Sequence, residues 1–374
     1  MCQDQAAIQQ KTPPVNSVIV TGASGFLGQH VVKTLHEKAA DFVTYLVLFD
    51  KDTFVQKLDY KPKIPIECIT GSITDPEVVR KAVQKVDCVI HLAAVISVST
   101  FPNVKAMQDV NVKGTALLLD ACVGANVGII ITCSTQDTAV DLTDQTMVDE
   151  TYKVEPSNLA FGDYARTKLE AEKIVLAKHG SRLKNGDRLR TVVLRPGVLY
   201  GELDAIFVTE VIRNAKKQGG VLYHFGSPQA VSQYAYVGNV AWGFVCALRK
   251  LSQDTSIGGE AYFIGDETPL MQLFKFSELF IKLYGGRLSS RPIPYTLILV
   301  VVLLLEWIVW LISPIKQINL PISSSTVRYA NKKWSFSYNK AKTELNYSPL
   351  FDWEESYSRS CEYYKTAVTL QMTE

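Results

Sequence analysis

The sequence predicts an α/β fold in which helices cover both faces of a doubly wound parallel sheet. Residues 17–21 (S-V-I-V-T) form a short apolar run rich in β-branched side chains, which indicates a buried strand. The glycine pattern Gly22-x-x-Gly25-x-x-Gly28 follows at once, and residues 26–38 have the spacing of a helix. A strand, a glycine turn and a helix in this order are typical of a dinucleotide-binding, Rossmann-type sheet.

The glycine turn has the features that a bound pyrophosphate requires. Gly22 and Gly25 allow a tight turn and a close approach of the backbone to the phosphates. The helix that starts at Phe26 and Leu27 offers N–H groups that favour negative charge, and Gly28 allows this helix to pack closely on the sheet. We therefore expect these five residues to contact the cofactor.

An acidic residue follows the second predicted strand. The apolar run at residues 43–49 ends in Asp50, at about the distance expected for a carboxylate that bonds the adenosine ribose hydroxyls. A carboxylate there repels a 2′-phosphate, which favours NAD over NADP, although Lys51 next to it weakens this preference. The alternative is a glycine turn followed by an ordinary surface aspartate.

Tyr164 and Lys168 form a second motif, with Ser134 upstream of it. Residues four apart on a helix share a face, so the Lys168 ammonium can lie near the Tyr164 phenol, stabilise its phenolate and lower its pKa. Free tyrosine has a pKa of about 10 and would be a poor base near neutral pH. An ordinary helix surface can carry the same pair, but the glycine turn and Ser134 favour catalysis. Residues 129–134 predict a buried strand that places Ser134 at its carboxyl end, where such sheets bind ligands.

These motifs together resemble the extended short-chain dehydrogenases/reductases. Residues 88–94 (C-V-I-H-L-A-A) resemble that family's fourth strand, whose end lies along the cofactor and here contains Ala93. Residues 109–114 (D-V-N-V-K-G) resemble the helix whose asparagine, here Asn111, helps to hold the catalytic geometry. These similarities imply a cofactor contact at Ala93.

Two further segments refine the comparison with that family. Residues 194–201 (L-R-P-G-V-L-Y-G) resemble the loop beside the nicotinamide, which implies a cofactor contact at Pro196. The family usually has Gly-Asp after the third strand, whereas this chain has Gly71 and Ser72. Any adenine contact at this point therefore lacks its carboxylate.

The second half of the chain narrows the resemblance. Residues 234–249, 262–269 and 336–349 follow one another as in the 3β-hydroxysteroid dehydrogenase/Δ5–Δ4 isomerases, and the similarity extends from about residue 15 to residue 364. The resemblance implies an NAD-binding Rossmann domain at 15–200. It also implies a smaller substrate subdomain that occupies most of 201–374, with some elements of the sheet interleaved in it.

This resemblance implies a two-step reaction. A 3β-hydroxyl of a steroid or sterol would lie between Ser134 and Tyr164, and Tyr164 would take its proton as hydride leaves C3 for NAD. Lys168 would hold the nicotinamide ribose. In the isomerising members an acid then moves a proton from C4 to C6, and the matching position is Asp266, followed by Glu267 where the family commonly has Asp. Tyr262 could donate to the dienolate oxygen, and the alternative for Asp266 is a solvated turn.

Two other functions stay open. A sterol 4α-carboxylate 3-dehydrogenase would use the same tyrosine and lysine but would lose carbon dioxide instead of isomerising. A nucleotide-binding sensor without turnover is the non-enzymatic alternative, and the intact set of Ser134, Tyr164 and Lys168 argues against it.

Composition limits the remaining possibilities. The chain has 374 residues, of which 47% are hydrophobic, and a net charge of +2 gives no electrostatic case for nucleic acid. Its seven cysteines form no C-x-x-C pair, which favours a reducing compartment, and its five histidines are isolated, so we expect no metal site. The polar residues 1–14 predict a mobile tail and no secretory signal.

The longest apolar run lies at residues 295–313. As a helix it would extend for roughly 28 Å, which is close to the thickness of the hydrocarbon layer of a membrane. Trp307 and Trp310 suit an interface, whereas Glu306 is costly in lipid. We expect a helix or hairpin inserted in one leaflet rather than a span, because a span would separate residues 339–349 from the Rossmann domain. A buried core helix is the alternative.

The resemblance and the apolar run together imply a place in the cell. We expect the endoplasmic reticulum membrane with the catalytic domain facing the cytoplasm, and a mitochondrial membrane is the alternative. Membrane lipid and a steroid or sterol are the expected partners, and a homodimer stays open.

Overall fold

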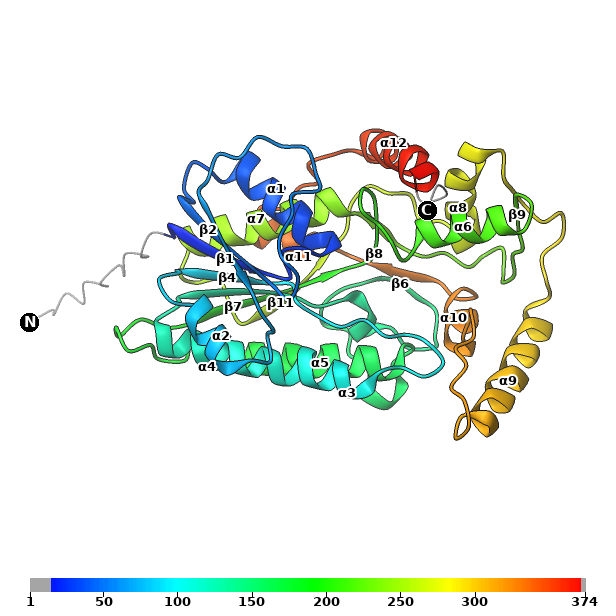
Figure 1. Ribbon diagram of the computed structural model, residues 1–374, viewed down its shortest axis with the longest axis horizontal. Helices are drawn as coiled ribbons and strands as arrows, with labels where there is room; N and C mark the ends of the chain where they lie inside the picture. Colours follow the sequence, from blue (N-terminus) through cyan, green and yellow to red (C-terminus); the bar gives the residue numbers. More distant parts are fainter. Residues whose placement is uncertain (1–14, 371–374) are drawn as a thin grey trace, which may run out of the picture.

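The computed structural model describes residues 15–370, and the predicted tail at 1–14 lies outside them. A parallel sheet of seven strands forms its centre, in the order β11-β7-β5-β4-β1-β2-β3 (Figure 1). The strands are β1 (Ser17–Thr21), β2 (Tyr45–Asp50), β3 (Ile66–Thr70), β4 (Cys88–His91), β5 (Ile129–Cys133), β7 (Arg190–Pro196) and β11 (Glu260–Ile264). The strand order reverses between β1 and β4, where doubly wound sheets bind their ligands. The predicted fold class is confirmed.

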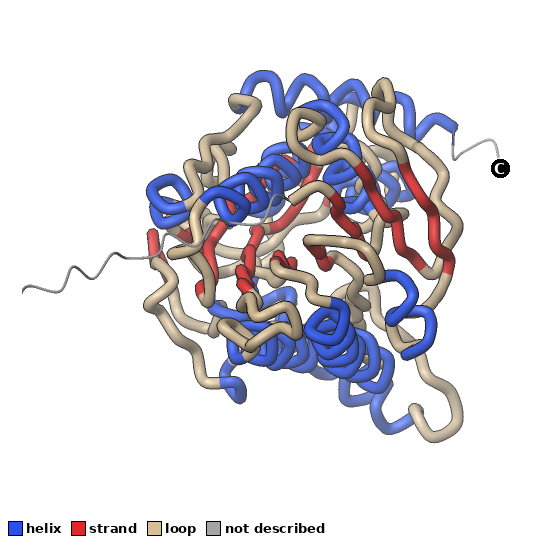
Figure 2. The backbone as a smooth tube through the Cα atoms, turned by 90° about the vertical axis from the view of Figure 1, so that its left-hand side faces the viewer, coloured by secondary structure: helices blue, strands red, loops and turns tan. Residues whose placement is uncertain are grey.

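Helices cover both faces of this sheet, as Figures 1 and 2 show. One face is covered by α1 (Phe26–Lys38), α7 (Val237–Gln253) and α11 (Asn339–Glu344). The other is covered by α2 (Pro76–Ala82), α3 (Val104–Met107), α4 (Thr115–Ala125) and α5 (Gly162–Ala177). Because α7, α11 and β11 come from beyond residue 201, the later half of the chain contributes to the Rossmann domain.

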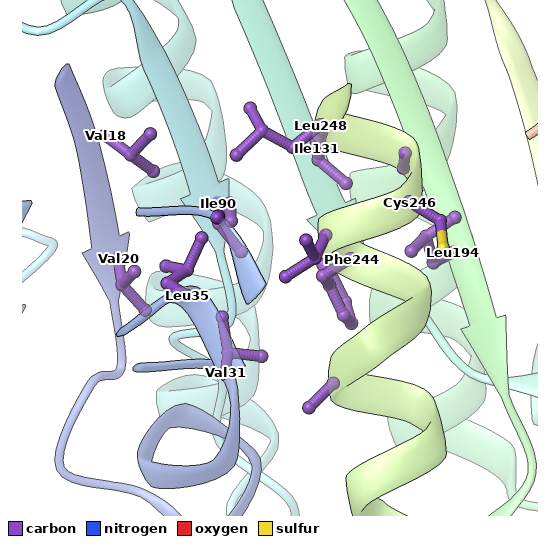
Figure 3. Close-up of a cluster of buried hydrophobic side chains, with 14 of the residues drawn as sticks. Val18, Val20, Val31, Leu35, Ile90, Ile131, Leu194, Phe244, Cys246 and Leu248 are labelled. Atoms are coloured by element: carbon purple, nitrogen blue, oxygen red, sulfur yellow. The ribbon is translucent and has the colours of Figure 1, made fainter. Parts of the chain in front are cut away.

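The sheet is buried on both faces, which explains the unbroken apolar sequence of its strands. Val18 and Val20 of β1 pack under α1 and α7, against Leu35 and Phe244 among others (Figure 3). Ile19, between them, packs into the core on the opposite face. Alternate residues of one strand thus serve two separate cores.

A smaller C-terminal subdomain lies beside the sheet. It contains β8 (Val198–Tyr200), α6 (Val208–Lys217), β9 (Val221–Leu222), β10 (Tyr234–Tyr236), α8 (Leu273–Ile281), β12 (Arg287–Leu288) and α12 (Trp353–Leu370). Its core is rich in aromatic side chains, and the rings of Tyr234 and Phe276 stack at 3.9 Å between centroids.

Residues 194–201 differ from the expected loop. β7 continues to Pro196, which pairs with Ile264 of β11, and β8 follows after one residue and pairs with β10. The expectation of a loop was wrong because β7 pairs with β5 and β11 and β8 pairs with β10. These partners are distant in the sequence, so the local sequence does not reveal the pairing.

The remaining elements connect these two parts. β6 (Gln145–Val148) pairs with β13 (Trp334–Phe336), and α10 (Ser324–Tyr329) precedes β13. Short helical turns occur at Gln136–Ala139, Pro156–Asn158 and Lys282–Tyr284, and a π-helix occurs at Gln108–Gly114.

The apolar run forms α9 (Tyr295–Ile312), which lies at the edge of the molecule beside α10 (Figure 1). Its 18 residues have a mean hydropathy of 2.5, and only 11% of them are buried. Val302 and Val309 are its two buried side chains. α9 is therefore not a core helix, and most of its apolar surface faces outward.

Candidate active site

The glycine turn between β1 and α1 leaves no room for side chains. Gly22 has a φ of +73°, and a Cβ added to it would lie 2.7 Å from the Ala93 nitrogen. A Cβ on Gly28 would lie 2.0 Å from the Gly22 oxygen. The first N–H groups of α1, those of Phe26 and Leu27, have no partner within the helix. The turn thus brings bare backbone and free N–H groups together, which is the arrangement that binds a pyrophosphate.

A cleft of about 270 Å³ extends from this turn. Its lining includes Gly22, Gly25, Asp50, Ser72 and Ala93, which come from the ends of four neighbouring strands and their loops. The structure therefore brings four of the predicted cofactor residues, Gly22, Gly25, Asp50 and Ala93, to one cleft. The cleft suits the adenosine half of a dinucleotide.

Asp50 faces the glycine turn from the end of β2. One of its oxygens accepts a hydrogen bond from the Ser24 N–H at 2.9 Å, and the other accepts from the Asp52 N–H at 3.0 Å. A carboxylate in this position can also accept from vicinal ribose hydroxyls, while it repels a phosphate at the same place.

Replacing Asp50 should weaken the preference for NAD. We expect Asp50→Ala to shift the NAD to NADP ratio of kcat/KM by roughly 10-fold or more toward NADP, because a charge repulsion of a few kcal/mol disappears. Asp50→Asn should act similarly while it keeps an acceptor for the Ser24 N–H. Asp59→Ala, on the exposed loop after β2, is the matched control. A wild-type preference for NADP would contradict this role.

The predicted catalytic residues meet at the carboxyl end of β5. Lys168 donates from Nζ to the Cys133 carbonyl at 2.6 Å, and the Tyr164 phenol hydrogen-bonds the Thr135 hydroxyl. Both side chains come from α5. Because Cys133 and Thr135 are the sequence neighbours of Ser134, these two contacts place Lys168 and Tyr164 on either side of it. The Ser134 hydroxyl is buried and has no hydrogen-bond partner among the described residues, which leaves it available to a ligand.

Asn111 holds the surrounding backbone. It lies in the π-helix at Gln108–Gly114, and such helices are frequent at functional sites. Its amide donates to the Val95 carbonyl at 2.9 Å and to the Thr167 hydroxyl at 3.2 Å, and its oxygen accepts from the Val95 N–H at 2.8 Å. Asn111 thus fixes the loop after β4 relative to α5, next to Lys168.

The electrostatics around Tyr164 differ from the sequence prediction. Burial raises the pKa of the Tyr164 phenol, the Asp137 carboxylate raises it further, and the hydrogen bond between Tyr164 and Thr135 lowers it in part. The expected lowering of this pKa by Lys168 is not found in this structure, where the ammonium is hydrogen-bonded to the Cys133 carbonyl. Sequence reasoning also missed Asp137, although it lies only three residues after Ser134.

Asp137 itself is poised to titrate near neutral pH. Burial raises its pKa to about 6, and its carboxylate accepts a hydrogen bond from the Thr135 hydroxyl at 3.0 Å. Because Thr135 also contacts the Tyr164 phenol, the three groups form a short chain. The charge of Asp137 opposes the formation of the phenolate.

Asp137→Asn should therefore move the acidic limb of the oxidation pH profile to lower pH, by roughly one unit, because it removes a negative charge beside Tyr164. The measurement is kcat for alcohol oxidation from pH 5 to pH 10. Asp149→Asn is the matched control, since the Asp149 carboxylate also accepts from a threonine hydroxyl, that of Thr151, but at an exposed site. A superimposable profile for Asp137→Asn would exclude this influence.

Asp266 lies apart from this group. One of its oxygens accepts from the Tyr236 N–H at 2.8 Å and from the Asn239 amide at 3.0 Å, and the other accepts from the Thr268 N–H at 2.9 Å. These bonds join the end of β11 to the start of α7. The geometry favours a structural role for Asp266, whose predicted catalytic role stays a prediction.

The two companions of Asp266 have surroundings of their own. Glu267 is exposed, and the Tyr262 hydroxyl donates to Glu344 at 2.7 Å. Pro196, predicted at the nicotinamide, is buried at the end of β7.

A second cleft, of about 200 Å³, contains Tyr164. The loop after β4 lines it with Ser97, Ser99 and Thr100, and α9 contributes Glu306. Among the described residues, the lining of this cleft includes neither Asp266 nor Glu267. Glu306 is the second residue that sequence reasoning did not place in the site, and its only signal was an acid within an apolar run.

Solved structures with the same fold come from several enzymes. DesIV, a dTDP-glucose 4,6-dehydratase from Streptomyces venezuelae solved as a double mutant with NAD and DAU bound, is 19% identical over 94% of this chain and 98% of its own, with a TM-score of 0.69. The UDP-glucose 4-epimerase of Thermus thermophilus in complex with NAD is 20% identical over 94% and 99%, with a TM-score of 0.64. The protein gox2253 is 23% identical over 94% and 98%, with a TM-score of 0.70. At these identities the similarity shows the fold alone.

The match of the sequence to a protein family is more specific than the similarity of the fold. A model of the 3-beta hydroxysteroid dehydrogenase/isomerase family matches residues 19–295, which is more than half of the chain. The match covers the glycine turn, Asp50 and the residues that meet at the end of β5. The chain therefore belongs to the 3-beta hydroxysteroid dehydrogenase/isomerase family.

Proposed function

We propose that this protein oxidises the 3β-hydroxyl of a steroid or sterol with NAD and then shifts the Δ5 double bond into conjugation with the new ketone. The observation that best supports it is the bracketing of Ser134 by Tyr164 and Lys168 at the end of β5. The membership in the family supports a steroid or sterol as the substrate.

The residues at the glycine turn fit NAD. The bare backbone of Gly22 and the N–H groups at the start of α1 would hold the pyrophosphate. Asp50 would bind the adenosine ribose, and Lys168 would bind the nicotinamide ribose. Several solved structures with this fold contain NAD, among them the epimerase and the dehydratase. When bound, NAD supplies the hydride acceptor.

Side chains of this protein orient the substrate hydroxyl and accept its proton. The free Ser134 hydroxyl orients the substrate oxygen, and Tyr164 takes the proton from that oxygen as hydride leaves C3. Because Tyr164 is buried, with only 8% of its surface exposed, water is largely kept from the reacting atoms. Lys168 must leave the Cys133 carbonyl, or share its protons, to stabilise the phenolate.

The proposed attachment of the protein to a membrane depends on α9. Its outward side chains are almost all large and apolar, and they include Leu297, Leu304, Trp307, Trp310 and Leu311. After α9 the chain returns to the Rossmann domain, where β13 pairs with β6 and α11 packs on β11. We propose that α9 lies in one leaflet of the endoplasmic reticulum membrane and that the catalytic domain faces the cytoplasm.

One comparison of substrates tests the proposed function. Purified protein in detergent is given NAD and, separately, a Δ5-3β-hydroxysteroid, a 4α-carboxysterol and UDP-glucose, while NADH and the absorbance of the conjugated enone are followed. We expect NADH and enone from the first substrate. NADH and carbon dioxide from the carboxysterol alone would indicate a decarboxylating dehydrogenase, and turnover of UDP-glucose alone would indicate a sugar nucleotide enzyme. Binding of NAD without turnover of any of them would indicate a sensor.

A further inference from the structure

The segment that contains α9 has a strong excess of positive charge. From residue 279 to residue 333 the chain has seven Lys or Arg residues and one acid, Glu306, a net charge of +6 in a chain whose total is +2. The Glu306 carboxylate accepts from the Ser324 N–H of α10 at 2.8 Å, on the side of α9 that faces the protein. The outward side of α9 and its flanking loops therefore have no acidic residue.

Two of the cations lie at the two ends of α9. Arg291 comes four residues before Tyr295, where the helix begins, and Lys316 comes four residues after Ile312, where it ends. The Lys316 N–H donates to the Ile312 carbonyl at 3.0 Å, so one more helical turn holds Lys316 at the end of α9. The 18 residues of α9 extend for roughly 27 Å between these two charges.

Neither cation has a partner within the protein. Both residues are exposed, and their side chains form no ion pair or hydrogen bond with any residue that the structure describes. The helix dipole favours a cation at the C-terminal end of α9, where Lys316 lies, but not one near the N-terminal end, where Arg291 lies. The stability of the helix therefore does not explain the two charges together.

The surface between the two cations is apolar. Leu297, Leu304 and Leu311 follow one another at intervals of seven residues, which places them on one face of the helix, and each is more than half exposed. Ile315, next to Lys316, is 90% exposed. An apolar face with a cation at each end is complementary to lipid tails beneath a layer of anionic headgroups.

We propose that Arg291 and Lys316 bind anionic phospholipid headgroups of one leaflet and hold α9 flat against it, an inference that rests on the proposed membrane attachment. A flat helix brings both of its ends to the same layer of headgroups. A helix that crossed the membrane would place one of the two cations in the opposite leaflet. Each cation close to an anionic lipid surface strengthens binding by about fivefold.

Binding to vesicles tests the inference with the full chain. Purified protein is diluted from detergent into phosphatidylcholine vesicles, with or without about 30% phosphatidylserine in the outer leaflet only, and bound protein is measured by flotation. We expect the wild type to bind the serine-containing vesicles about 25-fold more tightly at low salt. High salt should remove this preference, while the apolar face of α9 keeps the protein bound to both kinds of vesicle.

Arg291→Gln and Lys316→Gln should each lower the preference by about fivefold, and the double variant should bind both kinds of vesicle equally. The matched control is Arg182→Gln combined with Lys184→Gln. These two exposed cations lie on the loop between α5 and β7, at the amino end of the sheet, and their removal should keep the preference. All variants should oxidise a Δ5-3β-hydroxysteroid in detergent at the wild-type rate, which shows that they are folded.

The outcomes separate this inference from the proposed function. Equal binding of the wild type to both kinds of vesicle, or an unchanged preference in the double variant, would overturn the inference alone. A loss of preference in only one of the single variants would contradict the flat orientation, because the other cation would then lie in the inner leaflet. A wild type that forms dimers and binds neither kind of vesicle would show that a second copy covers α9, and the proposed membrane attachment would fail as well.

Discussion

Tyr164→Phe should lower kcat for oxidation of a 3β-hydroxysteroid by about 1,000-fold or more while the Kd for NAD changes little. The variant removes the one oxygen that can accept the substrate proton, and general base catalysis commonly contributes factors of 100 to 10,000, roughly. The phenol is buried against Thr135, so its loss leaves the fold and the cofactor cleft in place. Steady-state NADH formation and NAD binding by calorimetry measure the two effects.

The control for this variant removes a phenolic oxygen elsewhere. Tyr45→Phe loses a hydrogen bond to Glu67 on the exposed edge of the sheet and should keep wild-type turnover. Turnover by Tyr164→Phe within a few fold of wild type would show that another group is the base. A parallel loss of NAD binding would instead show that Tyr164 serves mainly to hold the cofactor.

Two charges on the outward face of α9 should release the protein from membranes. We expect Leu304→Glu combined with Leu311→Glu to lower membrane partitioning by at least about 100-fold, because burial of each leucine contributes roughly 1.5–3 kcal/mol and each charge in lipid adds a further cost. The wild type should sediment with membranes, resist high salt and dissolve in detergent, since apolar burial is insensitive to screening. Deletion of residues 297–311 should have the same effect as the two charges.

The matched control for α9 is Ile206→Glu. Ile206 is an exposed apolar residue of the C-terminal subdomain, 68% accessible, outside the apolar helix. Its replacement should leave the protein in the membrane fraction. Wild-type protein in the soluble fraction would contradict the proposed attachment.

The parts of the fold that local sequence determines were predicted well. The helix expected at residues 26–38 is α1 with the same bounds, and the strand expected to deliver Ser134 is β5, which ends one residue before it. Both depend on an unbroken apolar pattern and on glycines that no side chain could replace.

What failed depends on partners that are distant in the sequence. Most of residues 194–201 lie in β7 and β8, because β5 and β11 pair with the first and β10 pairs with the second. The alternative of a solvated turn for Asp266 was wrong, because donors from β10, α7 and its own turn occupy its carboxylate, while its predicted role as proton carrier stays a prediction. The pKa of Tyr164 rises because the fold buries its phenol near Asp137. The spacing of four residues between Tyr164 and Lys168 could not reveal this burial.

The chemistry at C3 can be followed with a labelled substrate. The purified protein is incubated with NAD and a Δ5-3β-hydroxysteroid that carries deuterium in place of the C3 hydrogen, and the NADH is analysed by mass spectrometry, with the 3α-epimer as a parallel reaction. We expect NADH that contains one deuterium from the 3β-alcohol and no NADH from the epimer, because Ser134 and Tyr164 hold the oxygen on one face of the ring. Unlabelled NADH, or equal turnover of both epimers, would contradict the proposal that this site oxidises a 3β-hydroxyl by direct hydride transfer.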